Sequence, residues 1–436
     1  MSAPDPTETR LIALIDAAER AYVSGREDEA DRHLAEAQAL APGHPLVLNQ
    51  TGVHDLRRDR NETARELFER CVALAPKYVP GWINLGSALR ALGRREDEME
   101  ALDRALALDP QNLLVLLQKG SLLELLGKPR ASAVYYQQAL NRLPPGMNLP
   151  TFLEPSVRRA MEVVHANNLE LEAFLATKLA GVRETCGAES QARFDHGLAA
   201  LLGKRRIFAP QPTFLHVPRL PALEFHERDG LPWLATLEAA REDIGREAAR
   251  LLAEELHEFV PYIDVAGTAP DPWNGLNHSH RLSAYYLWKA GTADQRHLAR
   301  CPATAALLAS AEIPRADVPG YGPTAFFSSL EPKTRIPPHA GATNARALVF
   351  LPLVAPPGTY VRSGSDIRPC VAGEPLVFDD TLETEIRNES DSRLVALVFD
   401  VWNPLLSGTE RELVRGATGG VREYYEGEAP GPAWPI

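Results

Sequence analysis

The chain has 436 residues, about three times the usual size of a domain, so we expect two or three domains. Hydrophobic residues make up 45% and charged residues 24%, an ordinary globular composition that excludes a collagenous, low-complexity or mainly disordered chain. The net charge of -12 argues against broad binding to nucleic acids or anionic membranes, because both need clustered positive charge.

The first ten residues, MSAPDPTETR, lack the basic and apolar segments of a signal peptide, and no apolar run of about 18 residues occurs. We therefore expect a cytoplasmic protein with no nucleic-acid or membrane partner. The cysteines stand singly, without a CxxC pair, which favours buried thiols in a reducing compartment over zinc or redox chemistry. They are Cys71, Cys186, Cys301 and Cys370.

Residues 9–144 carry a repeat with a period of 34 residues. Small residues at fixed helix positions let two helices approach closely and large residues fill the gap, so each unit is predicted to be a helical hairpin. The segment from Trp82 to Pro110 most closely resembles a tetratricopeptide repeat, and about four such units fit this range. The repeated positions are Pro42, Pro76, Pro110 and Pro144; Gly52, Gly86 and Gly120; Gly25, Asp59, Gly93 and Gly127; and Leu34, Phe68, Leu102 and Tyr136.

Arrays of this kind stack into a superhelix whose concave wall often binds peptides. Amides recur at one position of the array, at Gln50, Asn84 and Gln118, and an amide can both donate to and accept from an extended backbone. We predict that the groove of the array binds a peptide or protein partner. The alternative is that these amides are solvated and that the array only docks on the rest of the chain.

The period is lost over residues 145–205, but helical patterning persists, so this range is predicted to be a helical connector that ends near Arg205. A proline-rich extended stretch and one more helix follow. Later segments such as RALVFLPLV and RLVALVFDVW are bounded by Pro, Gly or Asp. They predict an antiparallel sandwich or jelly roll within a domain over residues 206–436.

One histidine, His339, stands after two prolines and shortly before the longest apolar strand, an arrangement that aims its side chain. Around it, FFSSLEPKTRIPPHAGATNAR, GEPLVFDDTLE and LVFDVWNP resemble the aspartyl/asparaginyl β-hydroxylases. The resemblance runs over about 283–414 and implies a double-stranded β-helix core that uses Fe(II) and 2-oxoglutarate. Bacterial members of this family also place tetratricopeptide repeats upstream, so both halves of the chain agree.

Four residues match functional positions of the family. The resemblance implies that His339 is an iron ligand and that Ser328 helps to hold the cosubstrate carboxylate. It also implies that Arg346 lies near the carboxylate of the substrate, and Arg362 keeps the arginine that follows PPG. Both arginines are therefore candidate catalytic residues, and the alternative for each is a solvated or ion-paired strand residue.

Three other family positions are substituted. The second iron-binding histidine is expected where Thr384 stands, and a histidine that binds 2-oxoglutarate is expected where Phe350 stands. An arginine for the distal carboxylate of 2-oxoglutarate is expected at Leu394. The adjacent Arg393 is the remaining candidate, although alternation along a strand would turn it out of the barrel unless a bulge corrects it.

Two further histidines, His278 and His280, are spaced to share one strand face and are candidates for a second metal ligand from a neighbouring segment. The alternative is that they are surface residues or substrate contacts. The acidic pair Asp379 and Asp380 is interpreted as the turn of the family and not as a catalytic pair.

The leading hypothesis is an Fe(II) and 2-oxoglutarate dependent oxygenase that hydroxylates a side chain of a polypeptide recruited by the repeats. The first alternative is a non-catalytic member of the family that acts as a binding scaffold, which the apolar Phe350 and Leu394 favour. The second alternative is an altered enzyme with a different metal site. The fold class is the same in all three: a helical repeat solenoid followed by a double-stranded β-helix.

Overall fold

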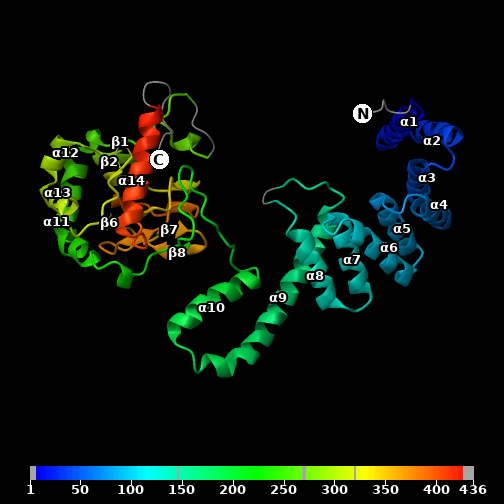
Figure 1. Cartoon of the computed structure of the whole chain (residues 1–436), viewed down its shortest axis with the longest axis horizontal. Coiled ribbons are helices and arrows are strands. Elements are labelled where there is room, and N and C mark those ends of the chain that lie inside the picture. Colours follow the sequence, from blue (N-terminus) through cyan, green and yellow to red (C-terminus); the bar gives the residue numbers. More distant parts are fainter. Residues whose placement is uncertain (1–5, 145–146, 268–271, 319–320, 426–436) are drawn as a thin grey trace. The chain divides into compact units, whose positions relative to one another are not determined.

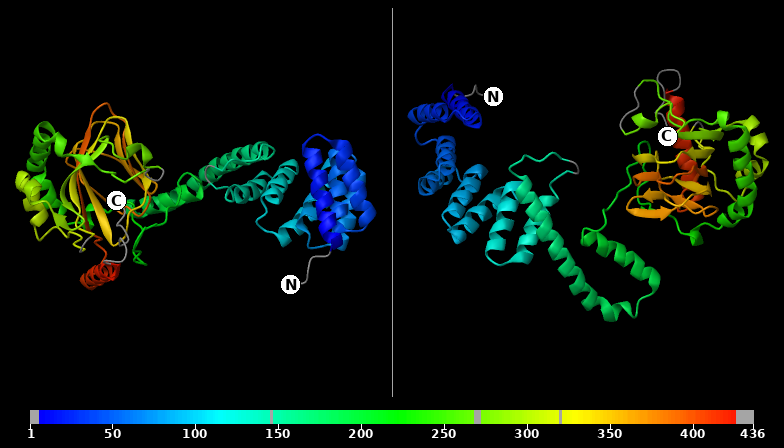
Figure 2. Two further views of the ribbon diagram at one scale, coloured as in Figure 1. Left: turned by 90° about the horizontal axis from the view of Figure 1, so that it is seen from above. Right: turned by 180° about the vertical axis from the view of Figure 1, so that it is seen from behind.

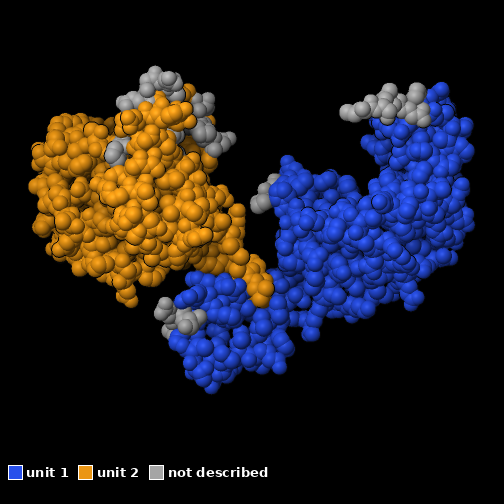
Figure 3. Space-filling model, in the orientation of Figure 1, with its two compact units in different colours: residues 1–198 blue, residues 199–436 orange. Residues whose placement is uncertain are grey.

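The computed structural model describes residues 6–144, 147–267, 272–318 and 321–425. The chain forms two compact units, residues 1–198 and residues 199–436 (Figures 1 and 3). The division lies shortly before Arg205, where the sequence places a boundary. Each unit has buried apolar clusters of its own. None of the described helices is long and apolar enough to cross a bilayer.

Unit 1 begins with antiparallel helical hairpins, in which α1 pairs with α2, α3 with α4, α5 with α6 and α7 with α8 (Figure 1). This confirms the predicted repeat. The helices are α1 (Pro6–Val23), α2 (Glu27–Leu40), α3 (Pro45–Arg57), α4 (Asn61–Leu74), α5 (Val79–Ala91), α6 (Arg95–Leu108), α7 (Leu113–Leu125) and α8 (Pro129–Leu140).

The repeated glycines explain why the helices of a hairpin pack so closely. A Cβ atom added to Gly52 would lie 2.6 Å from the ring of Phe68, and one added to Gly120 would lie 2.5 Å from the ring of Tyr136. Each glycine therefore leaves room for the large residue of the partner helix. The turn within each hairpin contains a residue with positive φ, namely Gly25, Asp59, Gly93 and Gly127.

Two further helices follow the hairpins, within the range of the predicted connector. Helix α9 spans Glu154–Arg183 and α10 spans Ala188–Leu201. The first turns of α9 bury Val157, Ala160 and Val164 against α7 and α8. The end of the array is thus covered by an apolar face, as solenoid ends require.

Unit 2 is a β structure with a group of helices on one side and the last described helix on another (Figure 2). Its strands are β1 (Val260–Pro261), β2 (Leu282–Lys289), β3 (Thr292–Ala293), β4 (Ala325–Leu330), β5 (Thr334–His339), β6 (Arg346–Val354), β7 (Thr359–Ser363), β8 (Asp366–Pro369), β9 (Leu376–Phe378), β10 (Thr384–Asn388) and β11 (Leu394–Trp402). Its α-helices are α11 (Leu234–Glu254), α12 (Gln295–Arg300), α13 (Pro302–Ala309) and α14 (Gly408–Tyr425). Its 3-10 helices are η1 (Arg228–Gly230), η2 (Leu256–Glu258) and η3 (Asn274–Leu276).

The described strands form two sheets. The larger has the order β1-β2-β4-β11-β6-β9, with β3 paired to β2, and the smaller has the order β5-β10-β7-β8. All neighbouring pairs are antiparallel. From β4 to β11 the chain passes repeatedly between the two sheets, which makes the double-stranded β-helix that the sequence predicts.

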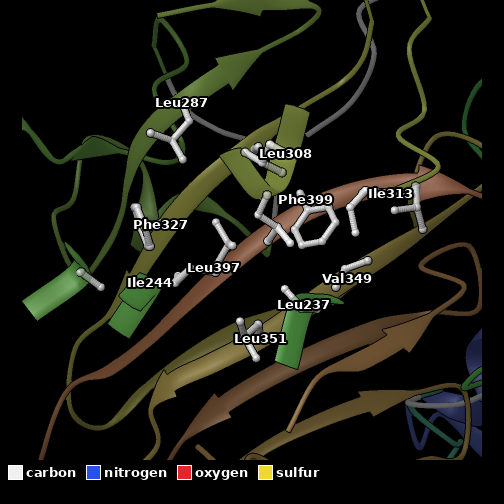
Figure 4. Close-up of a cluster of buried hydrophobic side chains, with 14 of the residues drawn as sticks. Leu237, Ile244, Leu287, Leu308, Ile313, Phe327, Val349, Leu351, Leu397 and Phe399 are labelled. Carbon is white, nitrogen blue, oxygen red and sulfur yellow. The ribbon is translucent and has the colours of Figure 1, made fainter. Parts of the chain in front are cut away.

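Side chains of the larger sheet alternate between two cores. On one face Phe327, Val349 and Phe399 pack under α11 and α13, as Figure 4 shows. On the other face Phe326 and Phe350 point between the sheets, where they meet apolar residues of the smaller sheet. The space between the sheets is therefore largely apolar, and polar side chains there mark a candidate site.

Candidate functional site

A cavity of about 150 Å³ opens beside the predicted iron ligand, His339. It lies where β5 ends, where β6 begins and toward the end of β11. Its lining residues are Tyr262, Tyr286, Lys289, Ala290, Tyr321, Thr324, Phe326, His339, Arg346, Leu348, Asp380, Val398 and Asp400. Polar groups within an otherwise apolar interior make it the candidate functional site of unit 2.

His339 is the last residue of β5 and is oriented by its surroundings. Its Nδ1 lies 2.8 Å from the backbone oxygen of Pro337, and its ring meets the edge of Trp273 with centroids 5.0 Å apart. Burial lowers the pKa of His339 below its ordinary value, so the imidazole is neutral at pH 7. Because the carbonyl can only accept, Nδ1 carries the proton and Nε2 keeps a lone pair.

Arg346, the first residue of β6, is the centre of a buried ion cluster. Its Nη2 donates to Asp380 Oδ2 at 2.9 Å, and its Nη1 donates to Asp400 Oδ2 at 3.2 Å. The Oδ1 of Asp400 also accepts from the backbone nitrogen of Thr324 at 2.7 Å. Two carboxylates thus raise the pKa of the guanidinium, although burial opposes its charge.

Asp380 is held in this cluster by a glycine. A Cβ atom added to Gly341 would lie 2.2 Å from Cγ of Asp380, and the backbone nitrogen of Gly341 donates to the backbone oxygen of Asp380 at 2.8 Å. The carboxylate therefore lies over a backbone that carries no side chain. Its Oδ1 is buried and has no hydrogen-bond partner among the described residues.

Thr384 is the neighbour of His339 across the β5–β10 pair, at the position where the family resemblance implies the second iron ligand. Its hydroxyl is buried and has no hydrogen-bond partner among the described residues. A bulge interrupts the pairing between Thr384 and Ile386, and a bulge can turn an adjacent residue such as Glu385 toward the other face of the sheet. Glu385, however, is bound to arginines on the outer face of the sheet, namely Arg335, Arg362 and Arg387.

The two apolar substitutions fill the interior between the sheets. Phe350 and Leu394 are fully buried and belong to one apolar cluster with Ile336 and Val361 of the smaller sheet. Ser328 is buried on β4, across from Ala396 of β11. Neither substitution lines the cavity beside His339, and Ser328 does not line it either. The predicted 2-oxoglutarate residues therefore do not meet the predicted iron ligand in an open space.

Both remaining arginine candidates are ion-paired away from the cavity. Arg362 binds Glu383 at 2.9 Å and Glu385 at 3.1 Å. Arg393 precedes β11 and lies 3.4 Å from Glu331, while the next residue along the chain points into the interior. A bulge does occur in β11, but it lies beyond Arg393 and does not bring its side chain into the cavity.

The two histidines proposed as alternative ligands lie on the surface. His278 is exposed, has a positive φ of 54° and lies 2.7 Å from Asp264 through its Nδ1. His280 is also exposed. Neither belongs to the lining of the cavity beside His339. The structure thus keeps His339 and Arg346 together and leaves the other predicted site residues elsewhere.

The residues beside His339 do not fit the family's iron centre. Among the described residues, no group of three or more His, Cys, Asp or Glu side chains is placed to hold a metal ion. A threonine hydroxyl is a weak ligand for iron(II), which prefers imidazole and carboxylate. The arginine and histidine that the family resemblance implies for 2-oxoglutarate are Leu394 and Phe350. No reaction step through iron or 2-oxoglutarate follows from this geometry.

Two aspartates of the site were not predicted as functional residues. Asp380 was interpreted as part of a turn, yet it forms one side of the Arg346 cluster. Asp400 stands alone in the apolar strand LVALVFDVW, and a charged residue at an inward position of such a strand is a signal of a buried polar site. The tyrosines that line the cavity carry no comparable signal, since they are common in β-strands.

In unit 1 the repeated amides bind neighbouring repeats. Gln118 donates to Ser87 at 3.0 Å, Asn84 to Asn49 at 2.9 Å and Gln50 to Glu19 at 2.8 Å. Each amide nitrogen therefore joins its helix to the first helix of the preceding hairpin. These hydrogen bonds stabilise the stacking of the repeats on one another. This role differs from the peptide binding and from the solvation that the sequence suggested.

Comparison with known proteins supports both halves of this description. Residues 238–404 match the family model described as Aspartyl/Asparaginyl beta-hydroxylase, and residues 79–122 match the model described as Tetratricopeptide repeat. The chain thus combines a tetratricopeptide array with a β-helix domain. The match to the hydroxylase model confirms the resemblance that the motifs indicate for this part of the chain.

Three curated relatives are hydroxylases. The aspartyl/asparaginyl beta-hydroxylase of Mus musculus is 31% identical over 130 residues, and that of Homo sapiens is 30% identical over 130 residues. These matches cover 30% of this chain and 17% of each relative. The ornithine lipid ester-linked acyl 2-hydroxylase of Rhizobium tropici is 27% identical over 179 residues, 40% of this chain and 59% of the relative.

Solved structures with partial similarity include repeat proteins. A tetratricopeptide repeat protein of Thermus thermophilus is 22% identical, with a TM-score of 0.29, over 44% of this chain and 97% of its own. The O-GlcNAc transferase of Thermobaculum terrenum is 25% identical, with a TM-score of 0.31, over 34% of this chain and 29% of its own. At such TM-scores these similarities carry no argument about function.

Proposed function

We propose that this chain is a polypeptide-binding member of the hydroxylase family. Its repeat array binds a peptide or protein partner, and its β-helix domain contacts that partner without turning over 2-oxoglutarate. The packing of Phe350 and Leu394 inside the β-helix carries the proposal, because the two side chains occupy positions that the resemblance assigns to 2-oxoglutarate. Thr384 beside His339 supports it, since a single imidazole leaves iron weakly held.

The array offers a cavity of about 550 Å³ for such a partner, lined by residues of α5, α7, α8 and α9. Apolar side chains are exposed at this cavity: Leu125 is 55% exposed and Phe152 is 72% exposed. Charged residues there are already paired, since Arg159 binds Glu124 at 2.6 Å. An apolar side chain of an extended peptide suits a cavity with apolar walls and neutralised charges.

Hydroxylation of the partner, with Fe(II) and 2-oxoglutarate, is the second candidate function. It is favoured by the orientation of His339, whose Nδ1 is bound to a backbone carbonyl in the way that metal-binding histidines are usually held. The hydroxylase relatives also support it. This candidate requires ligands other than the ones that the family resemblance implies.

Affinity capture with the full chain separates the two candidates. A Leu125→Glu, Phe152→Ser variant should lose the captured partner, whereas Val23→Glu should retain it, because Val23 is 76% exposed and does not line the cavity. The captured protein should keep its mass after incubation with Fe(II), 2-oxoglutarate and dioxygen. A gain of one oxygen atom would establish hydroxylation, and undiminished capture by the first variant would contradict binding at this cavity.

A further inference from the structure

The cavity beside His339 contains hydrogen-bond acceptors that lack donors. Oδ1 of Asp380 has no partner among the described residues, although the carboxylate is buried. Nε2 of His339 carries a lone pair, because Nδ1 donates to the backbone oxygen of Pro337. Leaving a buried acceptor without a donor costs about 1–3 kcal/mol. A ligand that brings N–H donors would remove this cost.

The buried charged groups of the cavity favour a cation. Asp380 and Asp400 face the single guanidinium of Arg346, so the cluster has one negative charge in excess when both carboxylates are ionised. Burial raises the pKa of Asp400, and the adjacent Arg346 opposes that rise. The sequence interpretation assigned Arg346 to an acidic group of the substrate, but both of its side-chain ion pairs are already made with carboxylates of this chain. An incoming anion would meet the carboxylate of Asp380 beside a guanidinium whose Nη1 and Nη2 are already ion-paired.

The walls and the size of the cavity also suit an organic cation. Tyr262, Tyr286 and Phe326 line it, and the rings of Tyr286 and Phe326 lie 5.4 Å apart. The ammonium of Lys289, an exposed residue at the rim, lies 4.6 Å from the ring centroid of Tyr286. This wall therefore already attracts one ammonium group of the chain. A cavity of about 150 Å³ holds a molecule the size of benzene, which is close to the size of a butylammonium ion.

We propose that this cavity binds a primary alkylammonium group of the lysine side-chain type, with the ammonium beside Asp380 Oδ1 and the alkyl chain against the aromatic wall. The site belongs to the β-helix domain alone, so the inference does not depend on partner binding by the repeats. The family resemblance implies an acidic ligand group near Arg346, whereas the ligand proposed here is a cation.

The test is a titration of the full chain with n-butylammonium chloride and, in parallel, with sodium pentanoate, a chain of similar length and opposite charge. Binding is followed by calorimetry and by tryptophan fluorescence, since Trp273 contacts His339. We expect saturable binding of butylammonium and at least tenfold weaker binding of pentanoate. The fluorescence change should disappear in Trp273→Phe while the heat of binding remains.

Two variants test the assigned residues. Asp380→Asn should weaken butylammonium at least tenfold, because it removes the excess negative charge. Lys289→Gln removes a competing cation from an exposed position and should strengthen binding severalfold, which keeps the test valid if Asp380→Asn fails to fold. Tighter binding of pentanoate than of butylammonium would overturn the proposal. So would an unchanged affinity for butylammonium in both Lys289→Gln and a folded Asp380→Asn. Displacement of butylammonium by manganese(II) at micromolar concentration would also overturn it, because it would indicate a metal site.

Discussion

Single side chains decide what the interior of this β-helix can hold. Thr384 is paired with His339 on the neighbouring strand, so replacing this threonine with histidine would give a site with two imidazoles. Asp380 lies over Gly341, where any larger residue would collide with its carboxylate. The chemistry of the cavity therefore depends on a few positions, while the strands around them are ordinary apolar segments.

Replacing Thr384 with histidine should create a metal site. Its side chain and that of His339 would lie on neighbouring strands at paired positions, close enough to share one ion. We expect cobalt(II) to bind at least tenfold more tightly to Thr384→His than to the unchanged chain, as measured by absorption spectroscopy. Thr384→Val, which keeps the size of threonine, is the control and should not bind more tightly. Equal affinity in all three proteins would show that position 384 does not face His339.

Asp379 should make the stability of unit 2 depend on pH. Burial raises its pKa to about 6, while Thr381 opposes the shift by donating to it from the backbone at 2.9 Å and from the hydroxyl at 2.6 Å. Between the ordinary value of 3.8 and about 6 the folded state holds a proton that the unfolded state releases. The stabilisation from this group is therefore complete below pH 3.8 and is lost as the pH rises through 6.

Asp379→Asn removes this group and keeps an acceptor for Thr381. Relative to the unchanged chain, the free energy of unfolding of the variant should rise by about 2 kcal/mol between pH 4 and pH 7. Urea denaturation at both pH values measures this change. Other titrating groups, such as His226, whose pKa burial lowers to about 4, contribute equally to both proteins, so their effect cancels in the difference. A constant difference between the two proteins would mean that Asp379 titrates normally.

At the scale of elements, the hairpins of unit 1 depend on the close approach of a glycine to a large residue. Gly120→Ala would place Cβ 2.5 Å from the ring of Tyr136, so we expect a loss of about 1–3 kcal/mol from overpacking. Gly197 in α10 has no atom within 4 Å of an added Cβ, so Gly197→Ala should stabilise that helix by up to about 1 kcal/mol. Thermal unfolding compares the two, and equal effects would contradict the packing argument.

The elements follow from local sequence patterns to a large extent. The 34-residue register predicts the helical hairpins, and apolar runs between Pro, Gly and Asp predict β6 and β11. The Arg346 cluster could not be predicted in this way, because its carboxylates come from β11 and from the turn after β9. Such pairing depends on the registers of the strands, and no local pattern reports those.

The orientation of individual strand residues was predictable where alternation holds. Leu394 points inward and Arg393 pairs with Glu331 outside, as the one-residue offset implies. The engagement of Glu385 with three arginines was not predictable, because Arg335 and Arg362 belong to two other strands. The repeated amides were identified from the sequence, but their partners in the preceding repeat depend on how the hairpins stack.

At the scale of the whole molecule, each unit has its own apolar core. The clusters of unit 1 lie among the helices from α1 to α9, and those of unit 2 lie on both faces of the larger sheet. We therefore expect calorimetry to resolve more than one unfolding transition. Gly120→Ala should lower the midpoint of one transition, and Asp379→Asn should change another. A single transition shifted by both variants would contradict independent cores.

The most direct test is an anaerobic calorimetric titration of the full chain with 2-oxoglutarate in the presence of iron(II). The packing of Phe350 and Leu394 predicts that the unchanged chain does not measurably bind 2-oxoglutarate. A variant that combines Phe350→His, Thr384→His and Leu394→Arg should bind it. Binding of 2-oxoglutarate by the unchanged chain, abolished by His339→Ala, would contradict the central claim. It would show that the β-helix keeps the hydroxylase cosubstrate site despite its apolar interior.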